Sequence, residues 1–313
     1  MTFRAPHVVL SEAVSDEAAG SRTAVILDGG MSNALEARGH DVSGPLWTAR
    51  MLRDAPAEIA AVHRAYYEAG ARVATTASYQ ASVPGFVAAG VDRSEAEKLI
   101  SRSITLARDV RDGLSTDGSA RWVAASVGPY GAVLADGSEY RGRYGLSRAQ
   151  LRDFHLPRLE LLASAGPDFV AVETIPDADE AAVLVDLLDD LGVSAWLSFS
   201  ARGSRTCAGQ PLTDAFAVAG SGSSVFAVGV NCCSPADVVP AVQLAARVTG
   251  KPAVAYPNSG AAWDAAARRW VGDSSFDGGS VRDWVQAGAA YVGGCCRVGA
   301  RDIAAIAAAL GQG

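Results

Sequence analysis

The chain carries two adjacent cysteines directly after two glycines, in the stretch Tyr291-Val292-Gly293-Gly294-Cys295-Cys296. Another cysteine follows a similar apolar run, in Val228-Gly229-Val230-Asn231-Cys232. Short, nearly continuous apolar runs of this kind are typical of strands that are buried on both faces. Whether these cysteines meet therefore depends on whether the two runs lie near each other in one sheet.

Similar apolar runs recur along the whole chain and alternate with longer helical patterns. The predicted strands are Ala24–Asp28, Arg72–Thr76, Trp122–Val127, Asp168–Val172, Ala195–Phe199, Val225–Val230, Ala253–Tyr256 and Ala289–Gly293. The predicted helices are Pro56–Ala69, Ser94–Arg111, Ser147–Ala165, Ala178–Leu191, Thr213–Ala219, Pro235–Val248, Ser280–Ala287 and Ala300–Leu310. Eight strands that are each followed by a helix predict an α/β fold, a closed (β/α)8 TIM barrel in a single domain.

An open, doubly wound sheet is the alternative architecture, and the end of the first predicted strand argues against it. Such sheets carry a glycine-rich phosphate fingerprint there, whereas Asp28-Gly29-Gly30-Met31 lacks the required glycine spacing. We expect a mobile leader over residues 1–20 and the barrel domain over residues 21–313. The predicted long loops are Arg38–Arg53, Ser200–Pro211 and Tyr256–Asp277.

Composition and charge exclude several classes of function. The 313 residues are 49% hydrophobic, which is enough for a large core, and the net charge of −7 argues against a nucleic-acid partner. We see no signal peptide, no basic cluster for an anionic membrane and no apolar run of the ~20 residues that cross a bilayer, so we expect a cytoplasmic protein. An odd count of five cysteines favours metal binding or catalysis over a disulfide framework.

In a (β/α)8 barrel the carboxyl ends of the strands meet in one mouth. Cys232 ends the sixth predicted strand, and Cys295 and Cys296 end the eighth, so three thiolates could converge on one ion. Adjacent residues of an extended strand face opposite ways, so a turn is required at Cys295. Gly293 and Gly294 would let the backbone make this turn and approach the ion.

Three protein ligands leave one coordination position open, which is the pattern of a catalytic zinc site rather than a structural one. A zinc ion held by three thiolates is a poor activator of water but is suited to binding another thiol. A free thiol has a pKa near ~8.5 and is mostly protonated at neutral pH, so such a site would supply the thiolate. Cys207, in a predicted loop, and Cys233, turned away by the strand pleat, are predicted to be non-ligands.

Other interpretations of the cysteine pair remain open. The cysteines could be small apolar core residues, a strained vicinal disulfide, or a dithiol redox site made by Cys295 and Cys296. A non-catalytic barrel with a structural zinc ion is a further alternative. Gly293-Gly294 could also belong to a phosphate site, which barrels often form after this strand.

Two carboxylates also end predicted strands. Asp28 and Glu173 could each pair with an arginine at the barrel rim or bind the α-ammonium of an amino-acid substrate. The aromatic rings of Trp47, Tyr79 and Tyr130 lie in strand-end loops, where they could bind a sulfonium cation or simply pack.

Gly29, Ser126 and Asn231 complete the candidates for substrate contact, because each lies at a predicted strand end. None of the four histidines does so, which argues against a serine hydrolase and against a histidine-ligated metal.

Taken together, these motifs resemble the homocysteine S-methyltransferase family. The resemblance rests on Leu27–Met31, Ser126–Ala132, Leu134–Tyr140, Val172–Thr174, Gly229–Cys232 and Gly293–Cys296, and it runs from about Val25 to the C-terminus. The Gly-Pro-Tyr-Gly-Ala and Ala-Asp-Gly-Ser-Glu-Tyr segments are more similar to the branch that uses S-methylmethionine or S-adenosylmethionine than to the betaine branch.

The resemblance implies zinc-dependent transfer of a methyl group from a sulfonium donor to L-homocysteine, which gives methionine. It implies that Cys232, Cys295 and Cys296 bind Zn²⁺. It also implies that Asp28 and Glu173 hold homocysteine, with Glu173 near the amino group. We expect a monomer or a small homo-oligomer.

Overall fold

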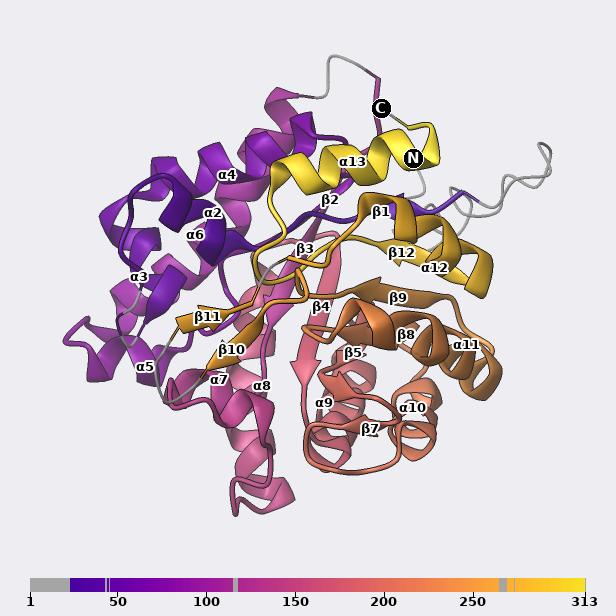
Figure 1. The fold of residues 1–313 in the computed structure, drawn as a ribbon. Helices are drawn as coiled ribbons and strands as arrows, with labels where there is room; N and C mark the ends of the chain where they lie inside the picture. The colour runs from indigo at the N-terminus through magenta and orange to yellow at the C-terminus, as the bar shows by residue number, and fades with distance from the viewer. Residues whose placement is uncertain are drawn as a thin grey trace, which may run out of the picture.

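Parallel strands form one sheet that closes on itself, as the alternation of runs predicted (Figure 1). The strands are β1 (Val25–Ile26), β2 (Val73–Thr75), β3 (Trp122–Val127), β4 (Phe169–Ile175), β5 (Ala195–Phe199), β8 (Val225–Asn231), β9 (Ala253–Tyr256) and β12 (Ala289–Val292). Their order is β1-β12-β9-β8-β5-β4-β3-β2, and a parallel bridge between Leu27 and Val73 joins the two outer strands. The fold is therefore the predicted (β/α)8 barrel.

This computed structural model describes residues 23–42, 44, 46–114, 118–264, 269–272 and 274–312. The leader predicted over residues 1–20 lies outside the described residues. The observed strands β3, β5 and β9 have the predicted bounds, whereas β4 continues past its predicted end at Val172 as far as Ile175. Glu173 consequently lies inside a strand and not after its end.

Helices cover the outside of the barrel (Figure 1). They are α2 (Met31–Ala37), α3 (Trp47–Asp54), α4 (Pro56–Glu68), α5 (Val83–Ala88), α6 (Arg93–Gly113), α7 (Tyr130–Leu134), α8 (Arg148–Ser164), α9 (Ala178–Leu191), α10 (Leu212–Ser221), α11 (Val238–Thr249), α12 (Val281–Ala287) and α13 (Ala300–Leu310), with 3-10 turns at η3 (Ser138–Tyr140), η4 (Pro235–Asp237) and η5 (Gly278–Ser280). Local signals fix several ends: Ser147 forms a capping box at α8, and Gly192 ends α9 in a left-handed conformation. Within the described part of the chain, no helix is long and apolar enough to cross a lipid bilayer.

The three predicted long loops contain short regular elements. The Arg38–Arg53 segment includes most of α3, which buries Ala49, Met51 and Leu52 and was missed because it has only two helical turns. The Ser200–Pro211 segment contains a hairpin of β6 (Ala201–Arg202) and β7 (Arg205–Thr206). The last predicted loop contains the hairpin of β10 (Ala262–Asp264) and β11 (Arg269–Val271).

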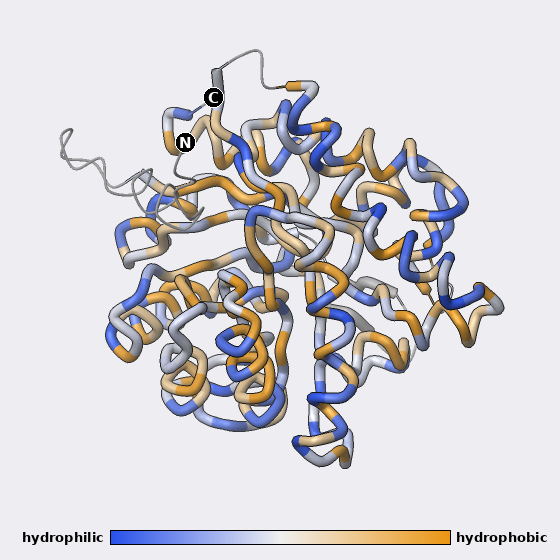
Figure 2. The backbone as a smooth tube through the Cα atoms, turned by 180° about the vertical axis from the view of Figure 1, so that it is seen from behind, coloured by the Kyte–Doolittle hydropathy of each residue, from blue (hydrophilic) through white to orange (hydrophobic). Residues whose placement is uncertain are grey.

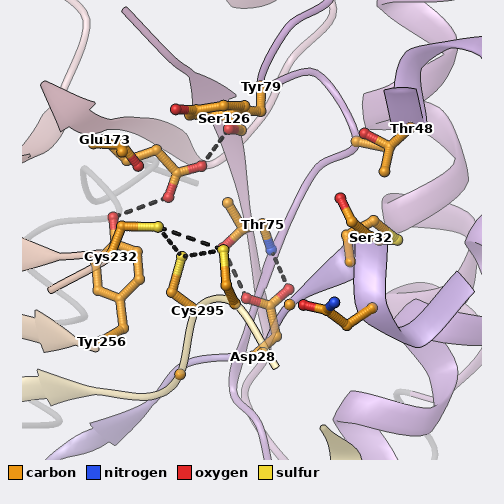
Figure 3. Close-up of a pocket in the computed structure, with 18 of the residues that line it drawn as sticks. Asp28, Ser32, Thr48, Thr75, Tyr79, Ser126, Glu173, Cys232, Tyr256 and Cys295 are labelled. Atoms are coloured by element: carbon orange, nitrogen blue, oxygen red, sulfur yellow. Dashed lines mark hydrogen bonds between the residues drawn. The ribbon is translucent and has the colours of Figure 1, made fainter. Parts of the chain in front are cut away.

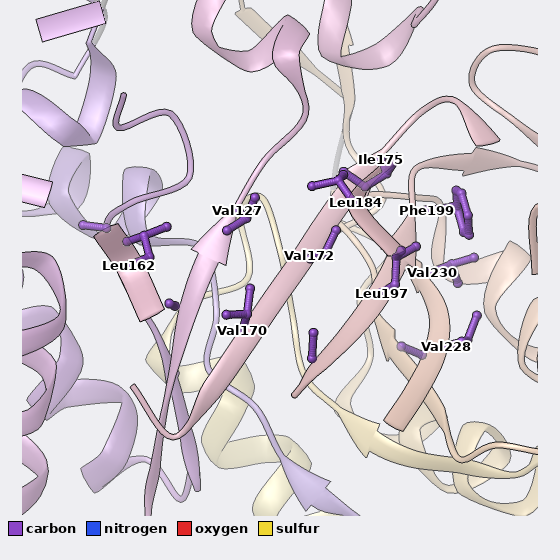
Figure 4. Packing of buried hydrophobic residues seen from close by; sticks show 14 of the residues in the cluster. Val127, Leu162, Val170, Val172, Ile175, Leu184, Leu197, Phe199, Val228 and Val230 are labelled. Carbon is purple, nitrogen blue, oxygen red and sulfur yellow. The ribbon is translucent and has the colours of Figure 1, made fainter. Parts of the chain in front are cut away.

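Alternate residues of each strand face two different apolar layers. Val170 and Val172 of β4 pack between the sheet and the helices, together with residues such as Leu197 and Val228 (Figure 4). Phe169 and Ala171 face the barrel interior. Polar residues, blue in Figure 2, lie mainly on the outer helices and loops. Because side chains alternate along a strand, the next interior position of β4 after Ala171 is Glu173.

Candidate metal centre and substrate pocket

Cys232, directly after β8, meets the cysteine pair that follows β12, as predicted, and Figure 3 shows Cys232 beside Cys295. Cys232 Sγ lies 3.0 Å from Cys295 Sγ and 3.6 Å from Cys296 Sγ, and the last two sulfurs are 4.0 Å apart. These distances exceed the ~2.05 Å of a disulfide bond, and all three thiols are free. The three sulfurs are close enough together to hold one metal ion. The adjacent pair is the most widely separated, which does not favour a vicinal dithiol site.

The loop after β9 holds the cysteine pair in position. The backbone N–H of Cys295 donates to the carbonyl of Pro257 at 2.8 Å, and that of Cys296 donates to Asn258 Oδ1 at 3.1 Å. Since β9 lies between β8 and β12, the strand that separates the two cysteine sites also supplies the groups that fix them.

Left-handed backbone at two non-glycine residues directs the sulfurs. Cys232 has a φ of 49°, and Arg297, directly after the pair, has a φ of 62°. The turn at Arg297 is held by its N–H, which donates to Asn33 Oδ1 at 2.6 Å. Such residues carry a conformational cost and cluster at functional sites, where surrounding contacts over-determine them. The predicted turn begins at Cys295, because the Val298 N–H donates to the Cys295 carbonyl at 3.2 Å, and Cys296 and Arg297 are its central residues.

The two glycines before the pair are needed for close packing and not for the turn that we predicted for them. Neither Gly293 nor Gly294 has a left-handed φ. A Cβ on Gly293 would lie 2.6 Å from Leu27 Cβ, and one on Gly294 would lie 2.0 Å from Val298 Cγ1. The absence of side chains thus lets the end of β12 lie against β1 and against the buried Val298 that follows the turn.

We expect Gly294→Ala to destabilise the fold by about 1–3 kcal/mol, the usual cost of overpacking, and to weaken metal binding. The added methyl group must displace Val298 or the backbone next to Cys295. Urea unfolding and metal content after dialysis measure the two effects. Gly113→Ala is the matched control, because its Cβ would meet only Arg64 at 3.9 Å. Wild-type stability and metal content in Gly294→Ala would contradict this explanation.

A pocket lies beside the three sulfurs and has a volume of about 120 Å³. One water needs only ~10–15 Å³ on this measure, so the pocket can take a molecule of several heavy atoms. Six of the predicted substrate contacts line it together with the cysteines: Asp28, Gly29, Trp47, Tyr79, Ser126 and Glu173.

Asp28 is held at the pocket floor by the neighbouring strand. Its carboxylate accepts hydrogen bonds from Thr75 N at 2.7 Å and from Thr75 Oγ1 at 2.9 Å. Burial raises the pKa of Asp28 to about 8, and the bonds from Thr75 oppose this shift. An amide and a hydroxyl, rather than a rim arginine, are therefore the partners of this carboxylate.

Glu173 is held by donors from two strands (Figure 3). Ser126 Oγ donates to Oε1, and Tyr256 OH donates to Oε2 at 3.0 Å. The Tyr256 hydroxyl is itself fixed by the indole N–H of Trp196 at 3.0 Å. Burial raises the pKa of Glu173 to about 7, against the effect of these hydrogen bonds. The carboxylate thus faces the pocket in a fixed orientation.

Asn231 lies outside the pocket lining and supports the backbone beside Glu173. Its Oδ1 accepts from Thr174 N at 2.7 Å, and its Nδ2 donates to Thr174 Oγ1 at 2.7 Å. Thr174 has a φ of 61°, and the pairing of β4 with β5 shifts register between Val172 and Ile175. Asn231 therefore provides the hydrogen-bond partners of Thr174, which lies in a strained bulge directly after Glu173.

Tyr130 and the two cysteines that we predicted to be non-ligands lie outside the site. Tyr130 packs its ring against Phe154 at 4.9 Å and does not line the pocket. Cys233 is buried in the core, and neither Cys233 nor Cys207 belongs to the group of three sulfurs.

Tyr140 and Tyr256 are among the pocket residues that the predicted site residues do not include. Tyr140 lines the pocket, and its hydroxyl lies 3.5 Å from Cys232 Sγ. Tyr256 also lines the pocket and ends β9, so its position at a strand end was a usable signal.

Comparison with known proteins agrees with this geometry. Residues 25–310 match the family profile described as homocysteine S-methyltransferase. The chain is 43% identical to homocysteine S-methyltransferase 4 of Zea mays, over 91% of this chain and 89% of that protein. It is 40% identical to homocysteine S-methyltransferase YbgG of Bacillus subtilis (strain 168), over 91% and 93%. The metallated form of the homocysteine methyltransferase MmuM from Escherichia coli superposes with a TM-score of 0.83 and 39% identity, covering 94% of this chain and 98% of that one.

Proposed function

This chain belongs to the homocysteine S-methyltransferase family, and we propose that it transfers a methyl group from a sulfonium compound to the thiol of L-homocysteine, giving methionine. The observation that carries the proposal is the convergence of three thiols beside a pocket that contains two buried carboxylates. A thiol substrate with a cationic amino group matches both features.

The three sulfurs fit a zinc ion. Tetrahedral zinc with Zn–S bonds of ~2.3 Å separates its sulfur ligands by about 3.8 Å. The separations of 3.6 and 4.0 Å that involve Cys296 are close to this value, and the 3.0 Å between Cys232 and Cys295 would widen on binding the ion. Soft thiolate ligands favour zinc over magnesium, calcium or manganese. Cys232, Cys295 and Cys296 would hold the ion. A zinc ion bound there would lower the pKa of a substrate thiol and so would keep that thiol ionised at neutral pH.

Asp28 and Glu173 would bind the α-ammonium group of homocysteine. Both are buried and have raised pKa values, so an ammonium group that enters the pocket would favour their ionised forms, and each charge would then act through little water. Thr75 orients Asp28, and Ser126 with Tyr256 orients Glu173. These fixed carboxylates would place the substrate sulfur toward the cysteines, and alignment of this kind contributes much of the acceleration in group transfer.

The aromatic residues of the pocket would receive the methyl donor. Trp47, Tyr79 and Tyr140 line it, and aromatic faces attract cations such as a sulfonium. In the transfer, a bond forms between the homocysteine sulfur and the methyl carbon while the donor carbon–sulfur bond breaks. The donor leaves as a neutral thioether, so a thiolate and a cation are consumed together and no proton moves in that step.

A donor screen tests the proposal. We expect S-methylmethionine, S-adenosylmethionine or both to give methionine from homocysteine, and betaine to give none. The same preparation should contain about one zinc ion per chain by elemental analysis, since one three-cysteine group is present among the described residues. Methionine formation from betaine at a similar rate would refute the assignment to sulfonium donors. Absence of methionine with every donor, in zinc-loaded protein, would refute methyl transfer.

A further inference from the structure

Arg158 of α8 places a buried guanidinium beneath the segment that carries Tyr79. The side chain is 4% exposed. Its Nη1 donates to the carbonyl of Gly128 at 2.9 Å, and its Nη2 donates to the carbonyls of Ser78, at 2.8 Å, and Tyr79. Ser78 and Tyr79 follow β2, and Gly128 follows β3. One side chain therefore ties together two of the connections that form the mouth of the barrel.

Burial of this cation is costly, and its hydrogen bonds go to backbone carbonyls and not to a carboxylate. Desolvation lowers the pKa of Arg158 to about 10, and the Nε–H has no hydrogen-bond partner among the described residues. A buried charge is usually paired with an opposite charge, because removal from water costs several kcal/mol. Departures from such local rules are expected where function requires them.

Tyr79 is constrained from its other side by Gly128. A Cβ on Gly128 would lie 2.5 Å from Tyr79 Cε2 and 2.7 Å from the Tyr79 carbonyl oxygen, so the ring packs directly over the glycine backbone. The ring then faces the pocket close to Ser126 and Glu173 (Figure 3). Arg158 thus fixes the backbone of Tyr79 while Gly128 provides the surface on which the ring lies.

We propose that Arg158 is a positioning residue of the methyl-transfer site, which acts by holding Tyr79 against the substrate pocket. This inference rests on the proposed function, because Tyr79 matters only if the pocket binds the reacting molecules. The guanidinium is required because its planar fork reaches three carbonyls at fixed angles, whereas a lysine ammonium is a single point with three donors. A displacement of only ~1 Å at a reacting group can cost about 100-fold in rate.

A double-mutant cycle with the zinc-loaded protein tests the proposal. We expect Arg158→Lys to lower kcat/KM for homocysteine by about 10- to 100-fold. The loss should come from kcat and from KM in the same proportions as the loss in Tyr79→Ala, and the zinc content should be unchanged. Combined with Tyr79→Ala, the lysine substitution should cost less than about threefold more. Arg152→Ala is the control: Arg152 lies on the same helix but pairs with Asp190 in solvent, and we expect wild-type kinetics.

Two kinetic results would overturn the proposal: wild-type kinetics in Arg158→Lys, or an equal loss from that substitution in the Tyr79→Ala background. Arg158→Gln, which keeps an amide donor, replaces the lysine variant in the cycle if the latter does not fold. A crystal structure of either variant gives a readout that does not depend on activity. The ring of Tyr79 should leave the surface of Gly128 while α8 stays in place. An unmoved ring refutes the positioning role even if the protein proves to catalyse another reaction.

Discussion

Cys295→Ala is expected to lose both its bound metal and its methyl transfer. The side chain supplies one of three sulfurs that lie within 4.0 Å of one another. Residues that only support a metal ligand are worth about 10- to 100-fold in metal affinity, so removal of a ligand itself should cost at least about 100-fold. Metal content after dialysis against a mild chelator and methionine formation on the same sample measure the two losses.

The control for this experiment is Cys207→Ala, which removes a half-buried thiol outside the group of three. It should keep both metal and activity. Circular dichroism and urea unfolding of Cys295→Ala separate a catalytic metal from a structural one. A catalytic site predicts a folded but inactive barrel, whereas a structural site predicts that the fold is lost with the metal. Full activity in Cys295→Ala would contradict the role of the cysteine group altogether.

The barrel and the meeting of the cysteines could be predicted because both depend on periodicity alone. Strands buried on both faces read as continuous apolar runs, and strand order around a (β/α)8 barrel follows the chain. Two cysteine sites at the ends of the sixth and eighth runs must then lie at the same rim with one strand between them. The exact bounds of β3, β5 and β9 were predicted for the same reason.

The contacts that orient the site could not be predicted in this way, because they depend on register and on the paths of loops. Thr75 reaches Asp28 only through the pairing of β1 with β2, which is a single bridge at Leu27 and Val73. Tyr140 reaches Cys232 because the η3 turn lies against β4. Nothing in the spacing of the sequence encodes either approach.

Asn231 illustrates the same limit at a position that we did select. Its place at a strand end was recognised, but its orientation depends on the bulge at Thr174 in a different strand. The pattern of apolar residues does not predict that Thr174 has a left-handed backbone conformation. The supporting position of Asn231 therefore emerges only from the structure.

Glu173→Gln is expected to weaken homocysteine binding strongly while zinc content stays unchanged. The substitution keeps the size of the side chain but removes the charge that would attract the α-ammonium. It also places an amide that can satisfy only one of the donors Ser126 and Tyr256. Loss of one member of a buried charged pair costs about 2–5 kcal/mol, which corresponds to a roughly 30-fold or larger rise in Kd.

Calorimetric titration of homocysteine measures the Kd of the variant. The control is Glu160→Gln, because Glu160 is an exposed carboxylate on α8. An unchanged Kd would remove Glu173 from the binding site.

The pH dependence of Glu173→Gln gives an independent check on the role of Glu173. The raised pKa of this carboxyl group makes stability fall as the pH rises, whereas it makes homocysteine affinity fall as the pH drops. In the folded chain the pKa of Glu173 is raised from 4.5 to about 7, so folding takes up a proton between these values. The contribution of Glu173 to stability is therefore fully present at low pH and is lost as the pH rises through about 7. Binding requires the carboxylate, so the affinity for homocysteine should fall as the pH drops through the same range, and a nearby metal cation would move this limb to lower pH. Glu173→Gln should abolish this part of both dependences. If the acid limb of homocysteine binding persists unchanged in the variant, it belongs to another group, such as Asp28, whose pKa is raised to about 8.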